Sequence, residues 1–302
     1  MRYQIHHRTT YDYSYPVSVS HHAATLRPLT DAGQTCNSFD LRIEPQPSDL
    51  LQRTDFFDNT VQLFSIQDSH ERLVVDANSD VTVQSKFRPI EGYRLTVGDS
   101  LERIRTEWSS GKIDTVQYAY PSPHVVLSDT VRRLSETFFR PNQDFIGAAC
   151  ALAAHIHDEF EFDSSATDVS TPIDEVIETK RGVCQDYAHV MIAALRAARL
   201  PARYVSGYIL THPPEGQPRL VGADASHAWV SVYAPEVGWI EIDPTNRQFC
   251  HLEHVKVAVG RDYSDVSMIR GALTGGDQHE IAIEVTMTPL NPQKPERYTL
   301  SW

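Results

Sequence analysis

Hydrophobic and polar residues alternate with a period of two over the first 90 or so residues. Pro, Asp, Asn and Gly separate the alternating segments, and Tyr, Val, Ile and Thr are frequent within them, which is typical of β-strands. The segments are Arg2–Tyr15, Cys36–Ile43, Thr60–Ile66 and Leu73–Val83. This pattern predicts an antiparallel all-β module, and no group of residues in it suggests chemistry.

After Gly98 the hydrophobic period lengthens to that of a helix. Several segments open with an Asp or Ser able to cap a first helical turn, and their apolar residues recur at 3.6-residue spacing. The predicted helices are Asp99–Trp108, Ser128–Phe139, Asp144–Phe160, a short one after Ser170, and a stronger one over Cys184–Arg199. The stretch that begins at Tyr120 (Tyr-Pro-Ser-Pro) indicates a domain boundary.

Beyond residue 200 the period returns to two. The predicted strands are 203–209, 228–233, 239–243, 255–259 and 280–288, with residues 234–238 as a hairpin loop. The whole pattern predicts an α+β fold in three parts. Residues 1–115 form a β-rich module, residues 120–250 a mixed core, and residues 251–302 a C-terminal β-extension packed on the core.

Composition and charge narrow the classes of partner. The net charge of −13 argues against nucleic-acid and anionic-membrane partners, which concentrated Lys and Arg would bind. No stretch approaches the roughly 18 apolar residues of a transmembrane helix, and residues 1–8 lack the apolar run of a signal peptide. The four cysteines show no paired spacing, so we expect a reducing, cytoplasmic location.

We predict neither a metal nor another cofactor. The fourteen histidines include several close pairs, among them Cys250-His251-x-x-His254, but none joins a second ligand pair at zinc-site spacing. An Asp-rich loop of the EF-hand type is also missing from the sequence, so calcium is not indicated.

Cys184 is the candidate nucleophile, because it stands where the strongest helix begins. The unsatisfied N–H groups and the dipole of a helix N-terminus favour a thiolate. Gly182 would allow another backbone or a substrate to approach closely. If Tyr233 pairs with Trp239 across the predicted hairpin, His227 and Asp243 lie on the same face of the sheet as diagonal neighbours. Their side chains would then be within reach of each other.

Four motifs resemble bacterial transglutaminase-like proteins in sequence and in order. They are Arg181-Gly-Val-Cys-Gln-Asp-Tyr-Ala-His, Pro201-Ala-Arg-Tyr-Val-Ser-Gly-Tyr, Ser226-His-Ala-Trp-Val and Gly238-Trp-Ile-Glu-Ile-Asp-Pro-Thr-Asn. The N-terminal stretch around Tyr11 and the later stretch from Gly260 are also similar to that family. The resemblance implies a papain-like core in which a Cys-bearing helix packs on an antiparallel sheet. It also implies a catalytic triad of Cys184 (nucleophile), His227 (base and acid) and Asp243 (orienting carboxylate).

The superfamily acts on amide carbonyls, so the resemblance implies an acyl-thioester on Cys184. Hydrolysis of a peptide or isopeptide bond is the first hypothesis, and acyl transfer to an amine is the second. A non-catalytic binding module on the same scaffold is the third. Peptides or proteins are the expected substrates, and family analogy suggests an ATP-grasp-type ligase as a partner.

Other polar and aromatic residues near the motifs have structural interpretations. Asp186 lies in the first helical turn, where an acidic residue stabilises the helix itself. His189 lies about one turn further on and can bond a neighbouring loop. Trp229 and Trp239 are interpreted as core or wall aromatics rather than as a substrate platform.

Overall fold

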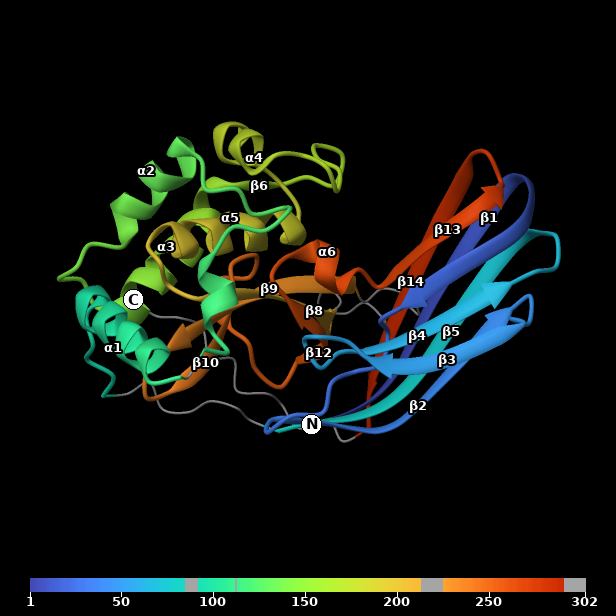
Figure 1. Cartoon of the computed structure of the whole chain (residues 1–302), viewed down its shortest axis with the longest axis horizontal. Coiled ribbons are helices and arrows are strands. Elements are labelled where there is room, and N and C mark those ends of the chain that lie inside the picture. The colour runs from blue at the N-terminus through green and yellow to red at the C-terminus, as the bar shows by residue number, and fades with distance from the viewer. Residues whose placement is uncertain (85–91, 112, 213–224, 291–302) are drawn as a thin grey trace.

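The computed structural model describes residues 1–84, 92–111, 113–212 and 225–290. Figure 1 shows two lobes side by side: a β-lobe and a mixed lobe in which helices cover a second sheet. Within the described residues, every helix is too short or too polar to cross a membrane.

The β-lobe is built around one long strand. β1 (Arg2–Ala24) pairs with β5 (His70–Val83) along its first half and with β4 (Thr60–Ile66) along its second. β2 (Gln34–Glu44) and β3 (Asp49–Thr54) complete the order β2-β5-β1-β4-β3. The four strands predicted from alternation are therefore confirmed. The pattern missed β3, whose six residues are all exposed and give no alternating burial.

The residues after 250 divide between the two sheets. β12 (His254–Gly260) pairs with β8 (Ala202–Ile209) in the mixed lobe. β13 (Ile269–Gly275) and β14 (His279–Pro289) instead pair with β1 in the β-lobe. The predicted extension 251–302 is thus not one unit packed on the core. A period of two indicates a strand, but it carries no information about which strand will be its neighbour.

The mixed lobe contains the five predicted helices. Their bounds are α1 (Val97–Ser109), α2 (Asp129–Phe138), α3 (Phe145–Glu159), α4 (Ile173–Thr179) and α5 (Cys184–Ala197). The short elements η1 (Val116–Ala119), β6 (Glu161–Phe162), β7 (Arg181–Gly182) and α6 (Tyr263–Val266) lie between or after them. Although α1 falls within the predicted β-rich module, its buried residues Val97 and Ile104 belong to the same hydrophobic cluster as α3 and α5.

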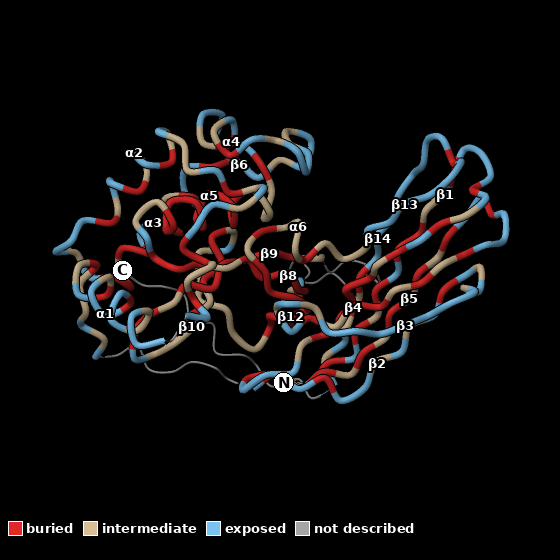
Figure 2. The backbone as a smooth tube through the Cα atoms, viewed as in Figure 1, coloured by how far each residue is buried: buried red, intermediate tan, exposed pale blue. Residues whose placement is uncertain are grey.

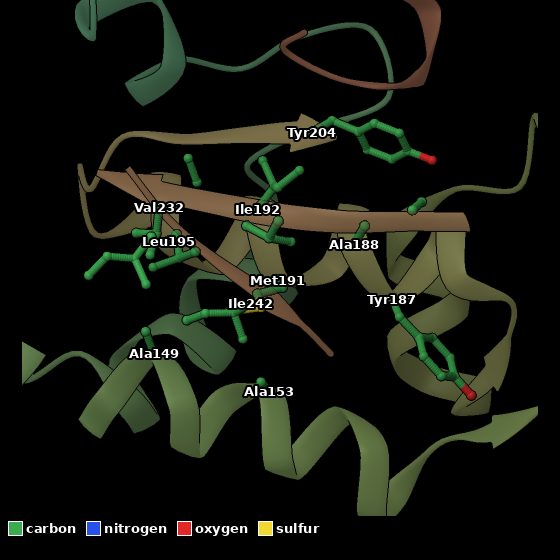
Figure 3. Packing of buried hydrophobic residues seen from close by; sticks show 14 of the residues in the cluster. Ala149, Ala153, Tyr187, Ala188, Met191, Ile192, Leu195, Tyr204, Val232 and Ile242 are labelled. Carbon is green, nitrogen blue, oxygen red and sulfur yellow. The ribbon is translucent and has the colours of Figure 1, made fainter. Parts of the chain in front are cut away.

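The sheet of the mixed lobe has the order β11-β10-β9-β8-β12. Its other strands are β8 (Ala202–Ile209), β9 (Ala225–Ala234), β10 (Gly238–Asp243) and β11 (Gln248–Phe249). Figure 2 shows α5 buried along most of its length, because it lies between this sheet and α3. Figure 3 shows Met191 and Leu195 of α5 packed near Val232 and Ile242 of the sheet. This packing fixes the position of α5 on the sheet, and with it the position of its first residue.

Two side-chain amides of the β-lobe bind the outer edge of β12. The Gln34 amide donates to Lys256 O and accepts from Lys256 N, both at 2.8 Å. The Asn59 amide does the same with Val259 O and Val259 N, again at 2.8 Å. These bonds satisfy main-chain groups on the outer edge of β12, where Lys256 O also accepts from Leu29 N at 3.1 Å. They also hold the two lobes in a fixed relation.

Candidate active site

Cys184 is the first residue of α5, and its side chain is partly exposed. Its backbone N–H has no acceptor within the helix, as at every first helical turn. The Asp186 carboxylate accepts from Val183 N at 2.8 Å and from Thr167 Oγ1 at 2.7 Å, which fixes the start of the helix. A Cβ on Gly182 would lie 2.7 Å from Asp186 Oδ2. Gly182 therefore makes room for this carboxylate, and not for a substrate as the sequence suggested.

The β9–β10 hairpin brings the other two predicted residues together. Tyr233 pairs with Trp239, so the assumed register is confirmed. His227 Nε2 and Asp243 Oδ2 lie 2.8 Å apart, and both side chains are buried. The alternation of side chains along the two strands, together with the hairpin register, is therefore sufficient to predict that His227 and Asp243 meet on one face.

The Asp243 carboxylate is fully enclosed and accepts hydrogen bonds from three further residues. Oδ1 accepts from the backbone N–H groups of Thr245 (2.9 Å) and Asn246 (3.2 Å). Oδ2 accepts from Asn246 Nδ2 (2.7 Å) and interacts with His254 Nε2 (3.1 Å). Burial alone would raise the pKa of Asp243, but His227 and His254 outweigh it and hold this pKa far below the usual range. Asp243 is therefore a carboxylate anion at neutral pH.

The Asp243 carboxylate stabilises the protonated form of His227. Burial alone would lower the pKa of His227, but the charge and hydrogen bond of Asp243 and the nearby Cys184 raise it to about 10. With Nε2 on Asp243, Nδ1 is the nitrogen left to interact with Cys184. The imidazolium thus lies between the Asp243 carboxylate and the Cys184 thiol.

His254 was not among the predicted site residues. The sequence pattern that contains it, Cys250-His251-x-x-His254, was considered only as a possible metal site and was rejected because its spacing does not fit zinc. Asp243 and His254 belong to β10 and β12, which stand three places apart in the strand order, so no local pattern links them. Only the pairing of β12 with β8 brings them to one face.

His189 has a structural role in this structure. Its Nε2 accepts from Tyr263 N at 3.2 Å, and its ring stacks on His124 with centroids 5.4 Å apart. Burial lowers the pKa of His189 to about 3, so it is neutral and can only hold the loop that carries Tyr263. This agrees with the interpretation made from the sequence.

The two tryptophans are wall and core residues. Trp229 is fully buried, and its Nε1 donates to Glu241 Oε2 at 3.2 Å. Glu241 in turn binds the buried Lys256 Nζ at 2.8 Å. The Trp239 ring lies under the Arg203 guanidinium, 4.2 Å from its centroid. Neither ring is placed as a platform for substrate.

Three side chains of the candidate site are of the types that bind metal ions. His227, Asp243 and His254 offer ligand atoms that lie within 4.8 Å of one another. The same atoms are already joined by hydrogen bonds of 2.8 and 3.1 Å, and a metal would have to replace the shared protons. We interpret them as a hydrogen-bonded set, and the absence of a cofactor stays a prediction.

Comparisons with known proteins agree with this geometry. Residues 3–82 match the family described as the bacterial transglutaminase-like N-terminal region, and residues 132–244 match the transglutaminase-like superfamily. The Mycobacterium tuberculosis protein Rv2569c is 34% identical over 296 residues, which cover 95% of this chain and 93% of the relative. A protein-glutamine gamma-glutamyltransferase of Pseudomonas aeruginosa is 38% identical over 100 residues, covering 32% of this chain and 15% of that one.

A solved structure shows the same fold over nearly the whole chain. It is a protein of Cytophaga hutchinsonii described as a candidate cysteine protease, with a TM-score of 0.75 and 20% identity. The match covers 99% of this chain and 96% of that one, so both lobes and their arrangement are shared. The chain therefore belongs to the transglutaminase-like superfamily, with the bacterial N-terminal region of that family preceding its core.

Proposed function

We propose that this protein hydrolyses a peptide or isopeptide bond through an acyl-thioester on Cys184. The observation that carries the proposal is the buried His227–Asp243 pair beside the thiol at the start of α5. A buried, fully hydrogen-bonded carboxylate that holds an imidazolium next to a helix-terminal thiol is an arrangement suited to nucleophilic catalysis.

The proposed reaction has two acyl-transfer steps. Cys184 Sγ attacks the carbonyl carbon of the amide, and His227 gives its proton to the departing amine as the C–N bond breaks. A water then attacks the thioester, His227 takes a proton from it, and the C–S bond breaks to release the acid. Asp243 keeps the imidazole oriented through both steps without itself taking the proton.

Charge develops on the carbonyl oxygen in each step. The backbone N–H of Cys184 has no helical acceptor and is the proposed first donor to that oxygen. The dipole of α5 adds to this stabilisation, because its positive end lies at Cys184.

Acyl transfer to an amine is the second candidate. The local similarity to a protein-glutamine gamma-glutamyltransferase favours it. The first step is unchanged, and an amine replaces water in the second. We also propose a reducing compartment, because none of the four cysteines is paired in a disulfide.

Labelling with iodoacetamide tests the nucleophile without knowledge of the substrate. Cys184 and Cys250 are both partly exposed, so Cys250 is a matched control thiol. At pH 6 an ordinary thiol is less than about 1% ionised, whereas we expect Cys184 to label rapidly. Since His227 keeps its proton until the pH approaches about 10, labelling of Cys184 should stay nearly constant from pH 6 to 9. Labelling of Cys250 should rise over the same range.

Peptide mapping by mass spectrometry gives the rate at each thiol. Equal rates at Cys184 and Cys250 at pH 6 would refute the activated nucleophile. A peptide library with and without an added amine then separates the two candidate reactions, and Cys184→Ala serves as the inactive control. Hydrolysed products support the first candidate, and amine-linked products support the second.

A further inference from the structure

We propose that His254 is a positioning residue of the active site: it holds the Asp243 carboxylate so that Asp243 can orient His227. This inference rests on the proposed function and adds a fourth member to the triad. His254 lies outside residues 132–244, which match the superfamily. It does not touch the reacting atoms, and it would act through Asp243 alone.

The hydrogen bonds of the His254 ring define which nitrogen carries the proton. Nδ1 faces the backbone N–H of His251 at 3.4 Å, so Nδ1 is the acceptor. Nε2 therefore bears the hydrogen and donates it to Asp243 Oδ2 at 3.1 Å. A histidine whose Nδ1 accepts from the main chain presents Nε2–H as a donor that cannot turn into an acceptor.

The surroundings of the ring leave it little freedom. The His254 side chain is 1% exposed, and the Asp243 side chain is fully buried. The ring meets Trp229 edge-on at 5.3 Å between centroids and His251 edge-on at 5.2 Å. A packed ring on one side and His227 on the other thus confine Asp243 Oδ2 to one position.

The β-lobe contributes to this arrangement through β12. Tyr3 Oη donates to Leu252 O at 3.1 Å, two residues before His254. The Gln34 amide holds both main-chain groups of Lys256, two residues after it. The strand segment that carries His254 is therefore fixed on both sides by the other lobe. This gives the β-lobe a part in the chemistry although it supplies no reacting group.

Two substitutions separate the hydrogen bond from the ring. His254→Phe keeps a ring of similar shape but has no N–H, whereas His254→Gln keeps an N–H donor. The readout is the iodoacetamide rate at Cys184 in the full-length protein. Losing one hydrogen bond to a charged group corresponds to about a tenfold effect.

We expect His254→Phe to lower the Cys184 rate about tenfold at pH 6, where the thiolate depends on an oriented His227. At pH 9.5, where an ordinary thiol is about nine-tenths ionised, the rate should match that of the wild type. His254→Gln should stay within about threefold of the wild type at both pH values.

Other results would overturn the inference. A wild-type rate for His254→Phe at pH 6, or an equal loss in both variants at both pH values, would leave His254 a packing residue. Failure of wild-type Cys184 to label at pH 6 would instead refute the proposed function itself.

A second test is read on the wild-type protein. Nitrogen-15 NMR of the imidazoles should show His254 protonated on Nε2 and not on Nδ1, with His254→Gln used for the assignment. The opposite tautomer would overturn the inference.

Discussion

The two faces of the five-stranded sheet in the mixed lobe are chemically opposite, although both contain fully buried side chains. Toward α5 the strands β9 and β10 present Val230, Val232, Ile240 and Ile242, part of the largest hydrophobic cluster (Figure 3). The alternate residues on the other face are His227, Trp229, Glu241 and Asp243. Asp243 and Ile242 are both fully buried, so burial does not distinguish these two neighbouring positions.

The difference lies in how each face is stabilised. The apolar face gains its stability from removal of surface from water, which requires volume and shape but few directional contacts. On the polar face each charge needs named partners, because an unpaired buried charge costs several kcal/mol. Asp243 has five such contacts. One face thus maintains the fold, and the other carries the proposed chemistry.

The sharpest test of this division is His227→Ala. Without the imidazolium, the Cys184 thiolate loses its partner, so iodoacetamide labelling at pH 6 should fall about a hundredfold, to the level of an ordinary thiol. The Asp243 carboxylate keeps its donors from Thr245, Asn246 and His254, so the variant should still unfold cooperatively. Mass mapping at pH 6 and a thermal unfolding curve check both statements. Loss of the folded state would mean that the polar face maintains the fold as well.

Ile242→Ala is the converse test. Ile242 precedes Asp243 in β10 and lies on the opposite, apolar face of the sheet. Its side chain is fully buried against α5, and truncation leaves a cavity that should lower the free energy of unfolding by about 3 kcal/mol. Labelling of Cys184 per folded molecule should stay within about twofold of the wild type. Urea denaturation measures the first quantity, and mass mapping measures the second. A large fall in labelling would show that the two faces are coupled through β10.

The features of the site that depend on neighbouring residues in the sequence could be predicted. Alternation along β9 and β10 and a short hairpin loop were enough to place His227 and Asp243 on one face, because parity and register are local properties. A helical stripe and a helix start were enough for Cys184. The role of His254 and the places of β13 and β14 in the sheets could not be predicted in the same way. Their positions depend on which distant strand each one pairs with, and the sequence carries no local signal for that choice.

Gln34→Met gives the smallest expected effect, and it tests whether the β-lobe supports the polar face. Methionine fills a similar volume but leaves Lys256 N and Lys256 O without their side-chain partner. Lys256 O keeps a hydrogen bond from Leu29 N at 3.1 Å, whereas Lys256 N and Leu29 O each lose their bond to the Gln34 amide. A buried main-chain group that loses its hydrogen bond costs about 1–3 kcal/mol, so the free energy of unfolding should decrease by about that amount. Because Lys256 is two residues from His254, labelling of Cys184 at pH 6 should also fall about twofold.

Asn59→Leu is the matched control on the same strand edge. It removes the corresponding pair of bonds to Val259, which is five residues from His254 rather than two. The substitution also removes the bond from Asn59 Nδ2 to Asp55 Oδ2 (3.0 Å), so the free energy of unfolding should fall by at least as much, while labelling of Cys184 per folded molecule should not change. Urea denaturation and mass mapping on both variants separate the two effects. If both variants reduce labelling equally, the β-lobe acts on the site through general stability. If only Gln34→Met does so, the β-lobe supports the polar face locally, through the segment of β12 next to His254.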